Sequence, residues 1–458
     1  MKTSRSTLGV AMLAFSMALS ACGGGGSAGN GNASGNSAID WPATPNSPAA
    51  PSWPANSGSG SSTSNSTPGG TIPANPTNAP ANGPATITPV SGSNTAAITV
   101  DGKTMINQPY VTITLCASNA QGSSQCATVD RMILDTGSSG VRVVASALSS
   151  AFAAQMPAQT GATDDPGGNA PIAQCATFGS GFTWGSVKRA AVTIGGETSS
   201  VIPVQLIGDA KFAVPTDCSA RGGKDLSTVS ALGGNGIVGI SNLVYDHAAS
   251  ANTIYPAGFY YCSSATSCTN TRVAVSKQPM NPVAAFPSDN NGTIIRLPGL
   301  SSAGAGSATG QVIFGIGTQQ NNTMPSGVNI LPLNQYGYFT SVYKGRLLTV
   351  SAVDSGTNMF VFPDSAIPIS NGFYVPAAPL ALAAIFQAAS GAGTPINVPF
   401  EIANANNLYA SGNAAFNNFG MNASGMVLWG LPFFYGRTVY TVLENAKVGA
   451  QAGPFVAF

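Results

Sequence analysis

Apolar and polar residues alternate over short distances in much of the chain after residue 105. Residues 110–115 have the sequence Tyr-Val-Thr-Ile-Thr-Leu, and this period of two is typical of a half-buried β-strand. One stretch, 379–389, is rich in Ala and Leu and predicts a helix. Many short strands separated by turn residues predict an all-β body. The further runs that we interpret as strands are residues 131–134, 190–194, 311–314, 346–350 and 440–443.

The composition favours turns and excludes several kinds of site. The 458 residues include 55 Gly and 32 Pro, and the length suffices for two compact lobes. Only 7% of the residues are charged and the net charge is +1, so we expect no nucleic-acid partner, which would need clustered Lys and Arg. The single histidine, His247, leaves little room for a zinc site or a Ser-His-Asp triad. We therefore expect no metal ion and no cofactor.

The N-terminus has the features of an export signal. Lys2 and Arg5 precede an apolar stretch at 8–19, which is too short to span a bilayer. The Leu-Ser-Ala-Cys22 sequence that follows resembles the bacterial lipoprotein signal, in which residues 1–21 are removed and Cys22 is lipidated. Gly rather than Asp comes next, which by the same resemblance favours anchoring to the bacterial outer membrane, on its periplasmic or surface side. The alternative is an ordinary secreted protein with a stray cysteine.

Residues 22–94 predict a disordered tether behind the lipidated cysteine. They consist mainly of Gly, Ser, Pro, Asn, Thr and Ala, and Asp40 is the only charged residue among them. Such a segment has too little regular apolar content to form a core. The folded body is therefore expected to run from Thr95 to Phe458.

Six cysteines remain after Cys22, and we interpret them as disulfides. An even number of cysteines in an exported chain suits an oxidising compartment. No Cys-x-x-Cys sequence occurs among them. Six cysteines allow 15 pairings, so spacing alone does not decide the pattern. The most economical set joins Cys116 with Cys126 across a hairpin and Cys262 with Cys268 around a small loop, which leaves Cys175 with Cys218.

Two segments of the body place a carboxylate in the same setting. Residues 132–139 have the sequence Met-Ile-Leu-Asp-Thr-Gly-Ser-Ser, and residues 351–357 have Ser-Ala-Val-Asp-Ser-Gly-Thr. Asp135 and Asp354 each follow an apolar run, where a carboxylate is costly to bury unless it is hydrogen-bonded or shares a proton. The glycine permits a tight turn, and the flanking hydroxyls can donate to the carboxylate. A simple Asp-Gly turn explains one such motif, but hardly two.

These motifs and several other segments resemble the pepsin-like aspartic peptidases. The resemblance covers most of residues 105–458. It implies an all-β, bilobal fold with lobes at 95–315 and 316–458 and a central active-site cleft to which each lobe contributes one aspartate. The chain also resembles a group of bacterial lipoproteins of unknown function. Besides the two aspartate motifs, the matching segments include 178–185, 236–240, 311–315, 333–339 and 428–430.

The resemblance implies a shared-proton mechanism. Like charges about 3 Å apart cannot both ionise, so Asp135 and Asp354 would hold one proton between them. The ionised partner would take a proton from water, and the protonated partner would polarise the carbonyl of an extended polypeptide. In the implied support of this dyad, Thr136 and Ser355 brace the paired loops, Ser138 and Thr357 bond the outer carboxylate oxygens, and Gly137 and Gly356 form the turns.

Residues 178–185 resemble the flap hairpin that covers a bound peptide. The family usually has Tyr where this chain has Phe178, and Trp where this chain has Arg142. In the family those two groups hydrogen-bond to each other, so both partners of one contact differ here. The residues implied to form the flap tip are Phe178, Gly179, Ser180 and Gly181.

The sequence thus predicts an aspartic endopeptidase that acts as a monomer. An alternative of another class is a catalytically silent pepsin fold that binds peptides or cell-envelope components, and a third is a purely structural envelope lipoprotein. Residues 234–239 match the dinucleotide fingerprint G-x-G-x-x-G, but they lack a good preceding strand and the acidic residue some 20 positions further on. We interpret that match as structural.

Overall fold

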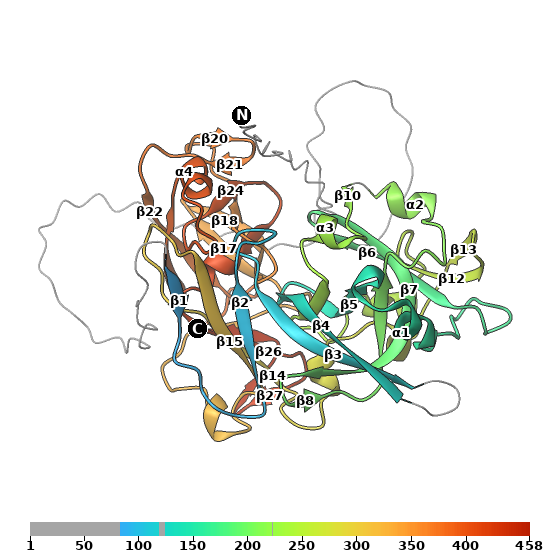
Figure 1. Cartoon of the computed structure of the whole chain (residues 1–458). Coiled ribbons are helices and arrows are strands. Elements are labelled where there is room, and N and C mark those ends of the chain that lie inside the picture. Colours follow the sequence, from blue (N-terminus) through green and yellow to red (C-terminus); the bar gives the residue numbers. More distant parts are fainter. Residues whose placement is uncertain (1–82, 119–123, 222) are drawn as a thin grey trace, which may run out of the picture. The chain divides into compact units, whose positions relative to one another are not determined.

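The computed structural model describes residues 83–118, 124–221 and 223–458, which all belong to one compact unit (Figure 1). Strands dominate these residues and the helices are short, so the predicted all-β class is confirmed. The predicted signal peptide, Cys22 and most of the predicted tether lie outside the described residues. No helix in the described part is long and apolar enough to cross a membrane.

The larger of two main sheets has 18 strands and contains both the first and the last strand of the described chain. Its members are β1 (Pro84–Thr86), β2 (Thr95–Val100), β3 (Tyr110–Ser118), β4 (Ser124–Asp135), β5 (Ser139–Val144), β6 (Ile172–Phe178), β7 (Gly181–Ile194), β8 (Glu197–Thr198), β9 (Ile202–Ile207), β10 (Lys224–Asp225), β11 (Gly236–Ile240), β12 (Phe259–Ser264), β13 (Ser267–Asn270), β14 (Gly292–Arg296), β15 (Ser307–Phe314), β16 (Ile330–Pro332), β26 (Thr438–Val442) and β29 (Phe455–Ala457).

The second sheet has nine strands, all between residues 339 and 429. Its members are β17 (Phe339–Tyr343), β18 (Arg346–Val353), β19 (Phe360–Phe362), β20 (Ile369–Ser370), β21 (Phe373–Tyr374), β22 (Leu380–Gln387), β23 (Ile396–Ile402), β24 (Gly420–Asn422) and β25 (Val427–Trp429). A separate two-stranded ribbon is formed by β27 (Lys447–Val448) and β28 (Gln451–Ala452).

Short helices connect the strands. Four are α-helical in the described residues: α1 (Ser150–Gln155), α2 (Thr216–Ser219), α3 (Val229–Leu232) and α4 (Ala405–Ala410). The 3-10 turns are η1 (Ala145–Ala147), η2 (Ala248–Ala251), η3 (Val275–Lys277), η4 (Pro282–Ala285), η5 (Gln320–Asn322) and η6 (Leu431–Phe433).

The alternating pattern of β3 explains why it lies against the core. Val111, Ile113 and Leu115 are buried, whereas Thr112 between them is exposed. A strand directs successive side chains to opposite faces, so the apolar set meets the interior and the hydroxyl set does not. The strands predicted from the other apolar runs are likewise present, in β4, β7, β15, β18 and β26.

The helix predicted at 379–389 is wrong, because this segment forms strand β22. It pairs antiparallel with β23, with Phe386 opposite Ile396, and also with β17. Ala384 and Phe386 are buried while Ile385 between them is exposed, so the segment follows a period of two. Pairing on both sides of the strand outweighs the helical preference of Ala and Leu, which is a weak local tendency.

Ordered structure begins before the predicted boundary at Thr95. Strand β1 pairs in parallel with β15, with Ala85 opposite Ala308. Ala85 is buried, and the Val90 amide donates to Gln311 Oε1 at 3.0 Å. The last dozen residues assigned to the tether therefore pack against the body.

The end of the chain returns to the larger sheet, where β26 pairs with β14 (Figure 1), and β29 with both β26 and β16. Sheet membership thus departs from a simple division at residue 316. The side chain of Asn242 ties these last strands to the segment after β11. Its Nδ2 donates to the carbonyls of Val442 and Phe455, each at 2.9 Å.

Three disulfides join the pairs that the spacing favoured. Cys116–Cys126 links the facing strands β3 and β4, and Cys262–Cys268 links β12 with β13. Cys175–Cys218 links β6 to α2, across 43 residues of sequence. This third disulfide fastens a surface helix to the hairpin formed by β6 and β7.

Candidate active site

The loop that carries Asp135 is held between two strands that share one neighbour. Strand β4 ends at Asp135 and β5 begins at Ser139. Strand β11 pairs in parallel with β4, with Gly239 opposite Asp135, and antiparallel with β5. Both ends of the loop are therefore fixed by the same strand.

The loop that carries Asp354 repeats this arrangement in the second sheet. Strand β25 pairs in parallel with β18 and antiparallel with β19, which lie on either side of the loop. The Asp354 amide donates to the carbonyl of Trp429 at 3.0 Å. A Cβ on Gly239 would lie 2.7 Å from the Ser138 carbonyl oxygen, and one on Gly430 would lie 2.4 Å from that of Thr357. The same close approach thus requires glycine in both halves.

The two aspartate loops meet each other directly. A Cβ on Gly137 would lie 2.5 Å from Cγ of Asp354, and a Cβ on Gly356 would lie 2.5 Å from Oδ1 of Asp135. Each carboxyl group therefore rests against the glycine of the opposite loop. Asp135 is buried and Asp354 is half-buried, and the two carboxyls interact with each other.

Each carboxylate receives a matching set of hydrogen bonds from its own loop. Asp135 accepts from the Gly137 amide at 2.7 Å and from the Ser138 hydroxyl at 2.5 Å. Asp354 accepts from the Gly356 amide at 2.8 Å and from the Thr357 hydroxyl at 2.7 Å. In both loops one oxygen binds an amide and the other a hydroxyl, which limits rotation of the carboxyl group.

Reciprocal hydrogen bonds brace the loops behind the carboxyls. The Thr136 amide donates to the Ser355 hydroxyl at 3.1 Å, and the Ser355 amide donates to the Thr136 hydroxyl at 2.9 Å. Each hydroxyl also donates to the carbonyl before the other aspartate: Ser355 to Leu134 at 2.7 Å, and Thr136 to Val353 at 3.2 Å. Because all four bonds are buried, separating the loops would leave several polar groups without partners.

The pair of carboxyls favours a proton on Asp354. Burial, and then the charge of Asp135, raise the pKa of Asp354 to about 7, against the opposing hydrogen bonds from Thr357 and Gly356. The neutral form of Asp354 is therefore favoured through the acid range. Two adjacent carboxyls that hold one proton can act as an acid and a base together.

The hairpin of β6 and β7 ends at the four residues predicted as a flap tip. Phe178 lies opposite Gly181, and Gly179 is exposed at the turn. Strand β10 pairs in parallel with the start of β7, with Lys224 opposite Gly181. The Cys175–Cys218 disulfide joins the same hairpin to α2. The hairpin is thus fastened on one side, while its turn remains accessible.

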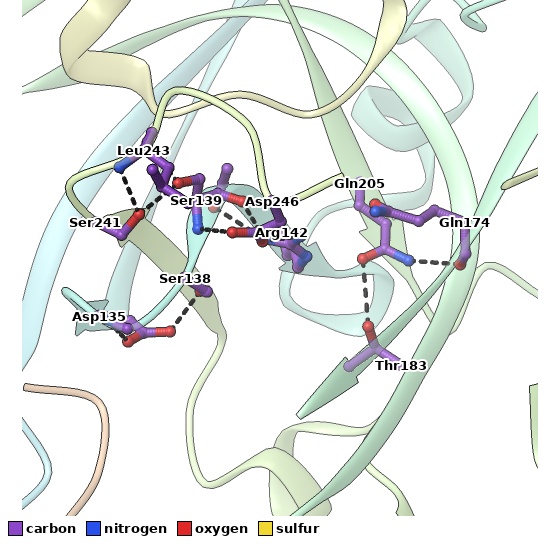
Figure 2. Close-up of polar contacts among 12 residues, drawn as sticks. Asp135, Ser138, Ser139, Arg142, Gln174, Thr183, Gln205, Ser241, Leu243 and Asp246 are labelled. Atoms are coloured by element: carbon purple, nitrogen blue, oxygen red, sulfur yellow. Dashed lines mark hydrogen bonds and ion pairs between the residues drawn. The ribbon is translucent and has the colours of Figure 1, made fainter. Parts of the chain in front are cut away.

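Arg142 lies in a buried polar network next to the first aspartate loop (Figure 2). Its Nη2 is 3.0 Å from Oδ2 of Asp246, and its Nη1 donates to the Ser139 carbonyl at 2.8 Å. The Ser139 amide donates back to Asp246 Oδ1 at 2.7 Å. The guanidinium carbon of Arg142 lies 5.6 Å from the centre of the Phe178 ring. The two positions at which the chain differs from the pepsin-like pattern are therefore in contact.

Sequence reasoning missed Asp246. It lies 104 residues after Arg142 and has no motif around it. The only available signal was that an arginine next to a buried strand needs a counter-charge, and this requirement does not select one acid among sixteen.

The glycine-rich match at 234–239 and His247, which the sequence also drew attention to, are parts of the packed fold. Residues 236–239 of the G-x-G-x-x-G match lie within β11, and a Cβ on Gly234 would lie 2.9 Å from the Arg131 carbonyl oxygen. The His247 ring packs edge-on against Phe259, and burial lowers its pKa. The described residues contain no group of three or more metal-ligating side chains.

Comparison with known protein families gives a match over most of the chain. The family model described as "Protein of unknown function (DUF3443)" matches residues 90–458. No curated protein matches the sequence.

Proposed function

The chain belongs to this family of proteins of unknown function, and we propose from the geometry of its two aspartate loops that it is an aspartic endopeptidase. One observation carries the proposal: Asp135 and Asp354 each rest against the glycine of the opposite loop, at the meeting point of two strand arrangements of the same kind. A structural Asp-Gly turn needs only one loop. Two loops that face each other bring together two carboxyls, which a stable fold would otherwise keep apart.

The chemistry follows from the unequal protonation of the pair. The raised pKa of Asp354 makes it the acid that donates a hydrogen bond to the substrate carbonyl. Asp135, which accepts from Gly137 and Ser138, serves as the base that takes a proton from a water bound between the carboxyls. The water oxygen attacks the polarised carbonyl carbon, and no covalent bond to the enzyme forms. Asp354 gives its proton to the carbonyl oxygen in this step, which leaves a neutral tetrahedral diol. Asp135 then gives the water proton to the amine nitrogen as the C–N bond breaks, and a hydroxyl of the diol returns a proton to Asp354.

The fold that we propose around this pair is the bilobal, pepsin-like one, with the aspartates at the floor of a central cleft. The duplicated strand arrangement in the two main sheets supports it. The hairpin that ends at Phe178–Gly181 would be the flap over an extended peptide. Its accessible turn suits that role, since a flap must open to admit substrate.

We also propose that the protein acts outside the cytoplasm, anchored through Cys22 to the outer membrane. The three disulfides support an oxidising compartment. The substrates would then be polypeptides of the periplasm or the cell surface.

A second candidate function is peptide binding without cleavage. It is favoured by the flap side chain Phe178, which has no hydroxyl with which to hold a substrate or a water. Such a protein would keep the dyad as a binding group for peptide carbonyls.

Digestion of a peptide library by the purified protein, at several pH values from about 3 to 7, tests the proposal over the range in which a shared proton matters. We expect cleavage by the parent and none by Asp135→Asn or Asp354→Asn. Asp130→Asn is the matched control, because Asp130 is an exposed acid on the same strand as Asp135 and should leave cleavage unchanged.

Binding of a statine-type inhibitor, measured by thermal shift, separates the two candidates. Stabilisation of a parent that cleaves no peptide would favour the binding function. Cleavage by either dyad variant at the parental rate would refute the peptidase mechanism, and the absence of both cleavage and stabilisation would refute both functions.

A further inference from the structure

Arg142 lies between the first aspartate loop and the hairpin tip at Phe178, two parts of the candidate site whose backbones do not pair with each other. We propose that it is a positioning residue which couples the first aspartate loop to the hairpin tip at Phe178. The coupling is a property of the folded chain, and its importance for cleavage rests on the proposed function. Neither residue type is the one that the pepsin-like pattern has at these positions.

On one side, Arg142 fixes the backbone that follows the aspartate motif. Its Nη1 binds the Ser139 carbonyl, and its Nη2 binds Asp246, which in turn accepts from the Ser139 amide. These bonds form a closed ring around Ser139, whose hydroxyl donates to the Leu243 carbonyl at 2.6 Å. Ser139 directly follows Ser138, the donor to Asp135. A shift of the Arg142 guanidinium would therefore move Ser139 and, through its neighbour Ser138, the hydroxyl that binds the Asp135 carboxylate.

On the other side, Arg142 supports the ring of Phe178. A guanidinium 5.6 Å from an aromatic centroid is within the range of cation–π attraction, which strengthens when water is excluded. Phe178 also packs against an apolar cluster that includes Ile133 and Ile237. Ile133 lies two residues before Asp135, so the ring packs near the cation and against a cluster to which the strand that leads into the aspartate loop contributes.

The burial of Arg142 argues against a purely stabilising role. The side chain is 1% exposed, and its Nε has no hydrogen-bond partner among the described residues. A buried donor without a partner destabilises a fold, and an apolar residue of similar size usually serves stability better. Asp246 neutralises the positive charge of Arg142, so Arg142 is not free to bind an anionic ligand. The remaining contacts of Arg142 are those to the first aspartate loop and to Phe178. Both contacts hold a part of the candidate site in position.

Arg142→Lys tests the coupling, because lysine keeps the charge but lacks the planar fork that binds a carboxylate and a carbonyl together. We expect the amides of residues 177–182 to exchange hydrogen for deuterium about tenfold faster in this variant, without any peptide present. On a cleaved peptide we expect KM to rise about tenfold with a smaller change in kcat, since a loosened flap weakens substrate binding first.

Arg437→Lys is the matched control. Arg437 is also a shielded guanidinium over an aromatic ring, 4.6 Å from the centre of Phe433, and it lies outside both aspartate loops and the hairpin. Its replacement should lower the melting temperature but leave hairpin exchange and KM unchanged. In a Phe178→Leu background, Arg142→Lys should accelerate hairpin exchange no further.

Two results would overturn the inference: unchanged exchange at 177–182 in Arg142→Lys, or equal acceleration in the Arg437→Lys control. If Arg142→Lys does not fold, Asp246→Asn breaks the same ring from its more exposed member and must show the same exchange pattern. The exchange measurement needs no catalysis. A parent that cleaves nothing therefore refutes the peptidase, while the coupling is still decided by exchange.

Discussion

Substitution of Gly137 by alanine is the most direct perturbation of the two aspartate loops. Gly137 has no left-handed backbone conformation, so an added methyl group brings no dihedral strain of its own. The methyl carbon would instead lie 2.5 Å from Cγ of Asp354 and 2.7 Å from each of its carboxylate oxygens. The clash therefore falls on the opposing carboxyl group.

The size of the effect follows from this distance. Non-bonded carbon atoms pack at about 3.5 Å, so Asp354 or the Gly137 backbone must move by about 1 Å. Overpacking of this kind destabilises a fold by about 1–3 kcal/mol. A misplacement of about 1 Å in a catalytic group reduces the rate by about 100-fold. We expect both losses in Gly137→Ala, and the same losses in Gly356→Ala, where the methyl group would meet Asp135.

Two measurements check this prediction: kcat/KM on the best peptide from the library, and the free energy of unfolding from urea titration. Gly167→Ala is the control, because Gly167 is exposed and a Cβ there would lie 3.8 Å from its nearest neighbour. A kcat/KM for Gly137→Ala within about threefold of the parent, less than 1 kcal/mol in barrier, would show that the loops are not in contact as described.

Three further predictions concern protonation, bracing and the hairpin. The free energy of unfolding should fall by up to about 4 kcal/mol as pH rises from about 4 to 7, because the folded-state pKa of Asp354 is raised above its unfolded value and the favourable neutral form is lost; an equally steep fall in Asp354→Asn would contradict this. Ser355→Ala should destabilise the fold by about 2–4 kcal/mol in urea titrations, since the Thr136 amide and the Leu134 carbonyl both lose a buried partner, and a loss below about 1 kcal/mol would count against the brace. Replacing both Cys175 and Cys218 by alanine should lower the free energy of unfolding by roughly 4 kcal/mol, the value expected for a closed loop of this length, and should accelerate amide exchange in the hairpin. Amide exchange at the parental rate would show that the disulfide does not restrain the hairpin.

Local patterns were sufficient to locate the two aspartate loops. Each is a short apolar strand followed by a carboxylate, a hydroxyl and a glycine, and the structure has β4 and β18 end at or just before Asp135 and Asp354. The disulfide pairing could also be predicted from the sequence, because Cys116 and Cys126 are close enough in sequence to face each other across one hairpin.

The features that the sequence did not reveal depend on distant partners. Residues 380–387 have good helical propensity and become a strand because β17 and β23 flank them. Strand β1 has only three residues, too few for a periodic pattern, and exists through its pairing with β15. The Arg142–Asp246 ion pair is of the same kind, since nothing near either residue marks the other.

The return of the last strands to the larger sheet has a consequence for biosynthesis. A ribosome releases the aspartate motifs long before it adds β26 and β29, whose Val442 and Phe455 carbonyls hold Asn242 just beyond β11. Until those strands are added, the segment just after β11, the strand that pairs on both sides of the Asp135 loop, lacks the hydrogen bonds of Asn242. A nascent or C-terminally truncated chain therefore contains both aspartate motifs without these two hydrogen bonds behind the first of them.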